Sequence, residues 1–67
     1  MKAVLKISNL NTSKDINAVK SAIISNEGIM ACQISKSTGD VNIVYDQYFT
    51  SIDEIIESIE NAGYIVI

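Results

Sequence analysis

The chain has 67 residues, the size of one small domain, and such a domain buries only about 60% of the surface that its unfolded chain exposes. Its net charge of −3 and its lack of Arg argue against nonspecific nucleic-acid binding, which depends on neutralising phosphates with basic side chains. No apolar run approaches the roughly 20 residues that cross a bilayer, and the N-terminus lacks a signal-peptide pattern. We therefore expect one cytoplasmic domain, residues 1–67, without membrane insertion.

The first half of the chain predicts a strand followed by a helix. Residues 3–7, "AVLKI", alternate between apolar and polar side chains, which is the period of a half-buried strand. Residues 12–28 then begin with Thr12 and Asp15, spaced as in a capping box, and Gly28 is expected to close the helix. The apolar stripe of this helix consists of Ile16, Val19 and Ile23.

The second half predicts a hairpin, a second helix and a last strand. Residues 29–35 and 40–46 read as strands joined by "KSTG", in which Gly39 fits the position of positive φ. Residues 50–64 have isoleucines at helical spacing, with Thr50 or Ser51 as the cap and Gly63 at the end. Residues 64–67, "YIVI", read as a short final strand.

The order of elements, βαββαβ, predicts an α+β fold, the ferredoxin-like two-layer sandwich. Because a crossover helix returns right-handed, the third strand fills the gap between the first and second. We expect a four-stranded antiparallel sheet of order 4-1-3-2 with both helices on one face. The side chains expected to point at the helices are Ala3, Leu5, Ile7, Val41, Ile43 and Tyr45. On the opposite face, Val4, Val44 and Ile65 are expected to form one apolar stripe.

Charge is distributed unevenly along the chain. All five Lys lie at or before Lys36, whereas the only charged side chains in residues 37–67 are those of Asp and Glu. The favoured interpretation is that these are the solvated faces of two neighbouring helices. The alternative is a bipolar surface that steers a charged partner.

The tail "VNIVYDQYFTSIDEIIESIENAGYIV" resembles the second half of heavy-metal-associated domains of the copper-chaperone type, and "NEGI" resembles their turn into the second strand. The resemblance covers essentially the whole chain. It implies a small cytosolic metallochaperone, or an N-terminal domain of a metal-transporting ATPase. Such domains pass Cu(I) between paired thiolates of a Gly-Met-x-Cys-x-x-Cys loop.

This chain departs from the family in that loop. The Gly of the motif falls on Asn9, the Met on Leu10, and the two Cys fall on Thr12 and Asp15. Cu(I) prefers sulfur ligands, so a hydroxyl and a carboxylate are the wrong donors, and the loop offers too few oxygens for a hard cation. We expect no metal site and no cofactor; Thr12 and Asp15 cap the helix, and Leu10 plugs the space beneath the loop.

Two further side chains bear on the site. The one cysteine, Cys32, cannot form an intrachain disulfide, and the resemblance places it inward, in the core. The resemblance also places Tyr64 near the loop, where in bacterial relatives it shields the metal. Catalysis has no support, because the chain lacks His, a nucleophile-and-base pair and a phosphate-binding glycine loop, so we expect no enzyme.

The leading functional hypothesis is a docking or regulatory module without the thiolate site. The expected partner-binding residues are Leu10, Asn11, Thr12, Ser13, Lys14, Asp15 and Tyr64. The expected partner is a protein, either a metal-transporting ATPase domain or a similar heavy-metal-associated domain, and a weak homodimer is a further candidate. Two alternatives remain: heavy-metal binding or transport through unusual or intermolecular ligands, and a structural spacer in a larger metal-transport protein.

Overall fold

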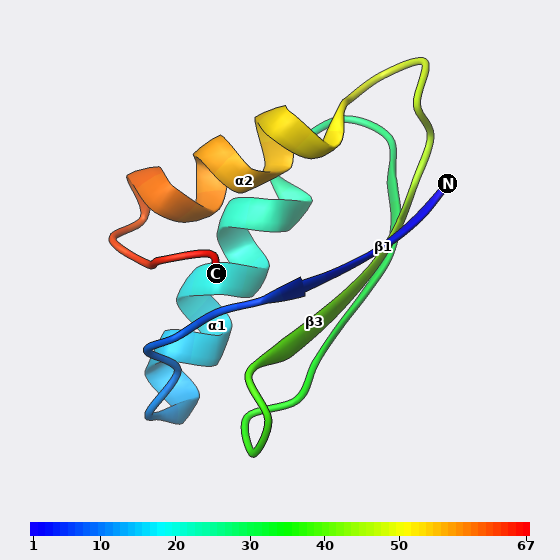
Figure 1. Cartoon of the computed structure of the whole chain (residues 1–67). Coiled ribbons are helices and arrows are strands. Elements are labelled where there is room, and N and C mark those ends of the chain that lie inside the picture. Colours follow the sequence, from blue (N-terminus) through cyan, green and yellow to red (C-terminus); the bar gives the residue numbers. More distant parts are fainter.

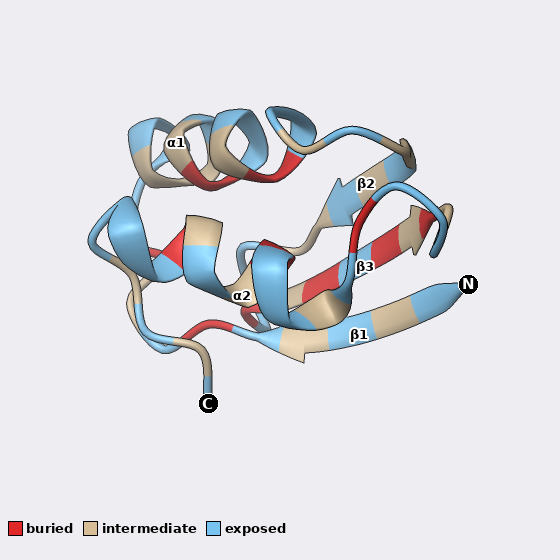
Figure 2. Cartoon of the chain, turned by 90° about the horizontal axis from the view of Figure 1, so that it is seen from above, coloured by how far each residue is buried: buried red, intermediate tan, exposed pale blue.

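The computed structural model describes residues 1–67 as two layers, a sheet and two helices (Figure 1). Both helices cover the same face of the sheet, so the other face is open to solvent (Figure 2). The elements in chain order are β1 (Lys2–Lys6), α1 (Ser13–Ile24), β2 (Ile29–Ile34), β3 (Asp40–Tyr45) and α2 (Ile52–Asn61). The expected α+β layering is confirmed.

The sheet has three strands in the order β1-β3-β2, and both pairs are antiparallel. The prediction of a four-stranded sheet of order 4-1-3-2 is wrong, because residues 64–67 contribute only a single antiparallel bridge between Ile7 and Val66. The cause is the closing turn of α2, in which the Tyr64 amide still donates to the Ile59 carbonyl (3.4 Å). Residues 65–67 then meet the chain only at and just beyond the end of β1.

The core lies between the sheet and the helices (Figure 2). Its nine buried apolar side chains are Ile7, Leu10, Val19, Ile23, Val41, Ile43, Tyr45, Ile55 and Ile59. Alternation along β3 and helical spacing along α1 and α2 place these residues on facing surfaces. Ala3 and Leu5 of β1 are half-buried and pack against this core, so the predicted inward face of the sheet is confirmed.

The helix ends correct one prediction and decide between two alternatives for another. α1 ends at Ile24 and is capped by Ser25, so Gly28 does not close it; Gly28 lies in the following turn with φ +83°. At the start of α2 the cap is Ser51, whose hydroxyl accepts from the Glu54 amide (3.3 Å). Thr50 instead donates its hydroxyl to Glu54 Oε2 (3.1 Å).

A β-bulge interrupts β2 near its start. Ile29 pairs with Tyr45 and Ala31 pairs with Val44, so Met30 is an extra residue without an opposite partner. A bulge of this kind turns the bulged side chain away from its regular alternation. Met30 is accordingly 68% exposed, whereas Cys32 is half-buried and packs against the core, as the resemblance implied.

The predicted apolar stripe on the open face forms only in part. Val4 lies opposite Asn42 and Val44 lies opposite Lys2, so the two valines are diagonal neighbours, and both line the same pocket. Ile65 is exposed near Ser8, whose amide donates to the Ile65 carbonyl (3.1 Å), beyond the last residue of β1. Ile65 therefore lies apart from the two valines, and the three residues do not form one continuous stripe.

Candidate functional site

The loop between β1 and α1 is fixed from below by an apolar anchor. Leu10 is buried in the core cluster together with Ile7 at the start of the loop. Asn11 and Thr12, which follow Leu10, are exposed. The predicted role of Leu10 as a plug beneath the loop is confirmed, and the polar residues after it lie at the surface.

Thr12 and Asp15 form a complete capping box at the start of α1. The Thr12 hydroxyl accepts from the Asp15 amide (3.2 Å), and Asp15 Oδ2 accepts from the amides of Thr12 (3.0 Å) and Asn11 (3.0 Å). These bonds satisfy backbone donors that a helix start leaves without partners. The capping predicted from the sequence is confirmed.

The second carboxylate oxygen of Asp15 is also occupied. Asp15 Oδ1 accepts a hydrogen bond from the Tyr64 hydroxyl (2.7 Å), across 49 positions of sequence. Gly63 makes this contact possible, because it turns the chain at the end of α2 with φ +95°, and its amide donates to the Glu60 carbonyl (3.0 Å). Tyr64 therefore lies beside the loop, where the resemblance placed it.

The hydrogen bond between Asp15 and Tyr64 shifts the pKa values of the two groups in opposite directions. The Tyr64 hydroxyl, with the amides of Asn11 and Thr12, lowers the pKa of Asp15 because all three donors stabilise the charged carboxylate. The same carboxylate raises the pKa of Tyr64, because the phenol must keep its proton to donate. The pair is therefore held as carboxylate and neutral phenol around neutral pH.

Asn9 is a residue of this site that the sequence did not indicate. Its side-chain oxygen accepts from the Ile65 amide (3.3 Å), one residue beyond Tyr64. Together with the bond from the Ser8 amide to the Ile65 carbonyl, this contact holds the C-terminal segment against the loop. A signal was present in the sequence, since Asn replaces the motif's Gly, but it does not reveal a partner so far along the chain.

The structure brings all seven predicted site residues together in one region, which we call the loop surface. It comprises Leu10, Asn11, Thr12, Ser13, Lys14, Asp15 and Tyr64, with Leu10 buried, Asp15 and Tyr64 half-buried and the rest exposed. Ser13 and Lys14 belong to the first turn of α1. The surface is therefore polar on the outside and anchored by Leu10.

The side-chain atoms that this surface could offer to a metal ion are oxygen atoms, with no sulfur or imidazole nitrogen among them. No group of three or more His, Cys, Asp or Glu side chains comes close enough together to hold a metal ion. Asp15 is a poor ligand because both of its oxygens already accept hydrogen bonds within the chain. Cys32 lies in β2, and its burial raises the pKa of the thiol, which disfavours the reactive thiolate.

The two helices are too short, and not apolar enough, for either to span a membrane. The structure thus offers a small domain with a closed, hydrogen-bonded loop surface at one end.

Models of protein families give no match to the chain. Among individual proteins, the copper chaperone CopZ of Staphylococcus haemolyticus (strain JCSC1435) is 27% identical over 61 residues, which cover 91% of this chain and 90% of that protein. The similarity therefore extends over nearly the whole length of both.

Solved structures match the fold closely. A CopZ metallochaperone has a TM-score of 0.95 at 22% identity, with all of both chains covered. A copper-binding domain from HMA7, a P-type ATPase, has a TM-score of 0.93 at 20% identity, covering 98% of this chain and 89% of that one. Oxidised MerP from Ralstonia metallidurans CH34 has a TM-score of 0.93 at 22% identity, covering 100% and 93%. These matches establish the fold.

Proposed function

We propose that this chain, a domain of the heavy-metal-associated, copper-chaperone type, works as a protein docking or regulatory module that does not carry metal in its loop. The proposal rests mainly on the hydrogen bonds that the Asp15 carboxylate accepts. Asp15 stands where the resemblance puts the second thiolate, and it accepts hydrogen bonds from Asn11, Thr12 and Tyr64. The loop is thus completed by the chain's own groups.

A loop completed in this way has a defined shape without a ligand. A preorganised surface loses less conformational freedom on binding a partner, which favours association. Leu10 holds the loop from below, and Tyr64 holds it from the side. These contacts support the loop surface as the part that a partner touches.

The partner we propose is a domain of a metal-transporting ATPase or another domain of the same fold. Similar structures include a copper-binding domain from a P-type ATPase and a metallochaperone, so this fold occurs on both sides of such a pair. Of the two charged side chains of the loop surface, Lys14 is exposed and Asp15 is half-buried. Lys14 favours a partner with an acidic surface at the contact.

The metal part of the proposal is tested by competition for Cu(I). The purified chain is titrated against a chromogenic Cu(I) chelator, and we expect the chelator to keep the metal. The variant with Thr12→Cys and Asp15→Cys restores two thiols at a helix start, where backbone amides stabilise thiolates. We expect this variant to bind one Cu(I) far more tightly than the parent.

A matched control separates restored chemistry from simple loss of the caps. The variant with Thr12→Ala and Asp15→Ala loses the same hydrogen bonds and gains no sulfur, so it should bind Cu(I) no better than the parent. Tight Cu(I) binding by the parent would contradict the proposal and favour unusual or intermolecular ligands. A folded double-cysteine variant without Cu(I) affinity would show that the loop geometry itself has diverged.

The docking part is tested by NMR titration of the labelled chain with the isolated domain of a metal-transporting ATPase from the same organism. We expect amide shifts concentrated at residues 10–15 and 64, and weaker binding after Lys14→Glu. Lys20→Glu, which changes an exposed Lys farther along α1, serves as the control. No shifts with such domains would contradict docking and favour the structural spacer.

A further inference from the structure

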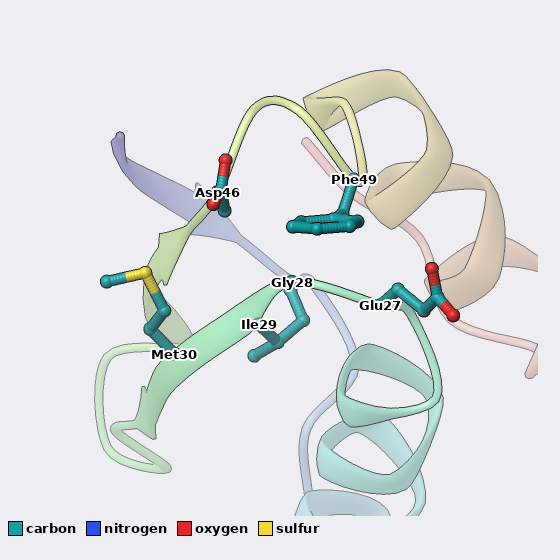
Figure 3. A pocket seen from close by; sticks show the side chains of 6 residues that line it. All are labelled: Glu27, Gly28, Ile29, Met30, Asp46 and Phe49. Carbon is teal, nitrogen blue, oxygen red and sulfur yellow. The ribbon is translucent and has the colours of Figure 1, made fainter.

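An apolar hollow lies at the end of the molecule opposite the loop surface (Figure 1). It has a volume of about 320 Å³ and lies between the start of β2 and the segment that follows β3. Its lining residues are Glu27, Gly28, Ile29, Met30, Asp46 and Phe49. Figure 3 shows the Phe49 ring over Gly28 and Ile29, with Met30 and Asp46 toward one side and Glu27 on the other.

The walls of the hollow are fixed by backbone geometry. The Asp46 amide donates to the Gly28 carbonyl (2.8 Å), and the Phe49 amide donates to the Asp46 carbonyl (3.1 Å). A Cβ atom on Gly28 would lie 2.8 Å from Phe49 Cβ, so only glycine permits this close approach. The bulge in β2 turns Met30 outward to the hollow. The hollow is therefore a formed feature and does not depend on mobile side chains alone.

The apolar side chains at this end are unusually exposed. Phe49 is 60% exposed, Met30 is 68% exposed, and Tyr48, next to Phe49 in the chain, is 91% exposed. The neighbouring Thr50 is buried, so at this end the chain presents its aromatic residues, and not Thr50, to solvent. Aromatic residues and Met are enriched at protein interfaces, and contiguous exposed apolar surface often marks one.

The charged side chains that line the hollow are all negative. Glu27 and Asp46 line it, and no Lys does. One Asp46 oxygen accepts from the Tyr48 amide (2.9 Å), which fixes the carboxylate in place. An anionic lipid surface would be repelled by these carboxylates, whereas Lys or Arg side chains would be attracted to them and to the face of the Phe49 ring.

We propose that this hollow docks an exposed segment of a partner protein in which one aliphatic side chain is flanked by Lys or Arg. The aliphatic group enters between Met30 and Phe49, and the cations pair with Asp46 and Glu27. This inference goes beyond the proposed function, because it uses none of the residues of the loop surface. The domain would then have two separate contact sites at opposite ends.

The test is an NMR titration of the labelled full chain with a short synthetic peptide that has one Leu between pairs of Lys. We expect amide shifts confined to residues 27–30 and 46–49. Phe49→Ala should weaken binding about tenfold, the effect of losing a central anchor side chain. Val4→Ala, which truncates an exposed apolar residue outside the hollow, should leave the affinity unchanged.

Charge dependence is tested with Glu27→Gln combined with Asp46→Asn. Asn can still accept from the Tyr48 amide, so the turn is preserved while both charges are removed. This variant should bind the peptide more weakly, and its residual binding should lose most of its dependence on salt. Unchanged affinity in this variant would overturn the assigned partner chemistry.

Three other outcomes would also overturn the proposal. Equal binding of a control peptide with Ser in place of Leu would show that the carboxylates attract cations without use of the hollow. Shifts along the acidic face of α2 instead of the hollow would place the contact elsewhere. Shifts at residues 27–30 and 46–49 that grow with protein concentration alone would make a second copy the occupant.

Discussion

On the loop surface, the exposed side chains are polar and the buried Leu10 is the apolar anchor, while both oxygens of Asp15 accept hydrogen bonds from within the chain. At the hollow end, Phe49 and Met30 are exposed, and backbone geometry fixes the walls. The carboxylate of Asp15 and the backbone amides at the start of α1 thus find their hydrogen-bond partners within the chain. The hollow end leaves apolar surface for which the chain itself provides no cover.

The comparison shows two ways to hold a surface in shape. A hydrogen-bonded surface depends on the protonation of its members, so its stability changes with pH. A surface shaped by a glycine and a bulge depends on steric fit. The two ends should therefore respond differently to substitution.

The largest difference is expected between Gly28→Ala and Gly63→Ala. Both glycines have positive φ, so both substitutions introduce backbone strain, but a Cβ at Gly63 meets nothing within 4 Å, whereas one at Gly28 meets Phe49. Strain of this kind costs about 1–3 kcal/mol. We expect Gly28→Ala to lower the free energy of unfolding, measured by urea denaturation, by more than Gly63→Ala does. Equal losses would mean that Phe49 moves aside freely.

Thr12→Ala removes the side-chain acceptor at the start of α1 and should cost about 0.5–2 kcal/mol. For a domain of this size the melting temperature falls by about 4–8 °C per kcal/mol. Thr12→Ser keeps the hydroxyl and is the matched control, with a melting temperature close to that of the parent. An unchanged melting temperature in Thr12→Ala would show that the hydroxyl does not stabilise the helix in solution.

Tyr64→Phe removes one donor to Asp15 and should lower the melting temperature less than Thr12→Ala, because water can replace a bond at the surface. Its clearer effect is on pH dependence. The folded state lowers the pKa of Asp15, so this contribution is present at neutral pH and is lost as the pH falls below about 4. The folded state raises the pKa of Tyr64, so stability is also lost as the pH rises above about 10.

These two losses should be smaller in Tyr64→Phe than in the parent. The measurement is the melting temperature across the pH range in both proteins. Identical pH profiles would mean that the hydrogen bond between Tyr64 and Asp15 does not persist in solution.

The smallest effect is expected for Met30→Gln at the hollow end. Met30 is exposed at a bulge and contributes little buried surface, so the free energy of unfolding should change by no more than about 0.5 kcal/mol. A larger loss by urea denaturation would mean that Met30 packs against the core and that the hollow end is stabilised like the interior.

The sequence predicted the parts of this molecule that depend on periodicity and local capping. Alternation in β3 and isoleucine spacing in α2 identified the core, and Thr12 with Asp15 identified the start of α1. These signals are local, so a single sequence contains them. The placement of Tyr64 came from the family resemblance, because it depends on the turn at Gly63.

The failures involve register and distant contacts. Only Ile65 fell outside the predicted stripe with Val4 and Val44, because its place depended on a fourth strand that alternation alone does not specify, and the bulge at Met30 has no clear sequence signature. The four-stranded sheet failed because α2 and its turn use the chain as far as Tyr64. The bond between Asp15 and Tyr64 and the hollow beside Phe49 both join segments far apart in sequence.

The single bridge between Ile7 and Val66 has a consequence for behaviour at high concentration. The C-terminal segment covers only the end of β1, with Ile67 donating to the Lys6 carbonyl (2.8 Å), so most of this strand forms an edge of the sheet. An uncovered edge can pair with a strand of another molecule and start aggregation, and lysines on the edge strand oppose this. Lys2 and Lys6 are exposed on β1, and their charges keep like edges of neighbouring molecules from joining.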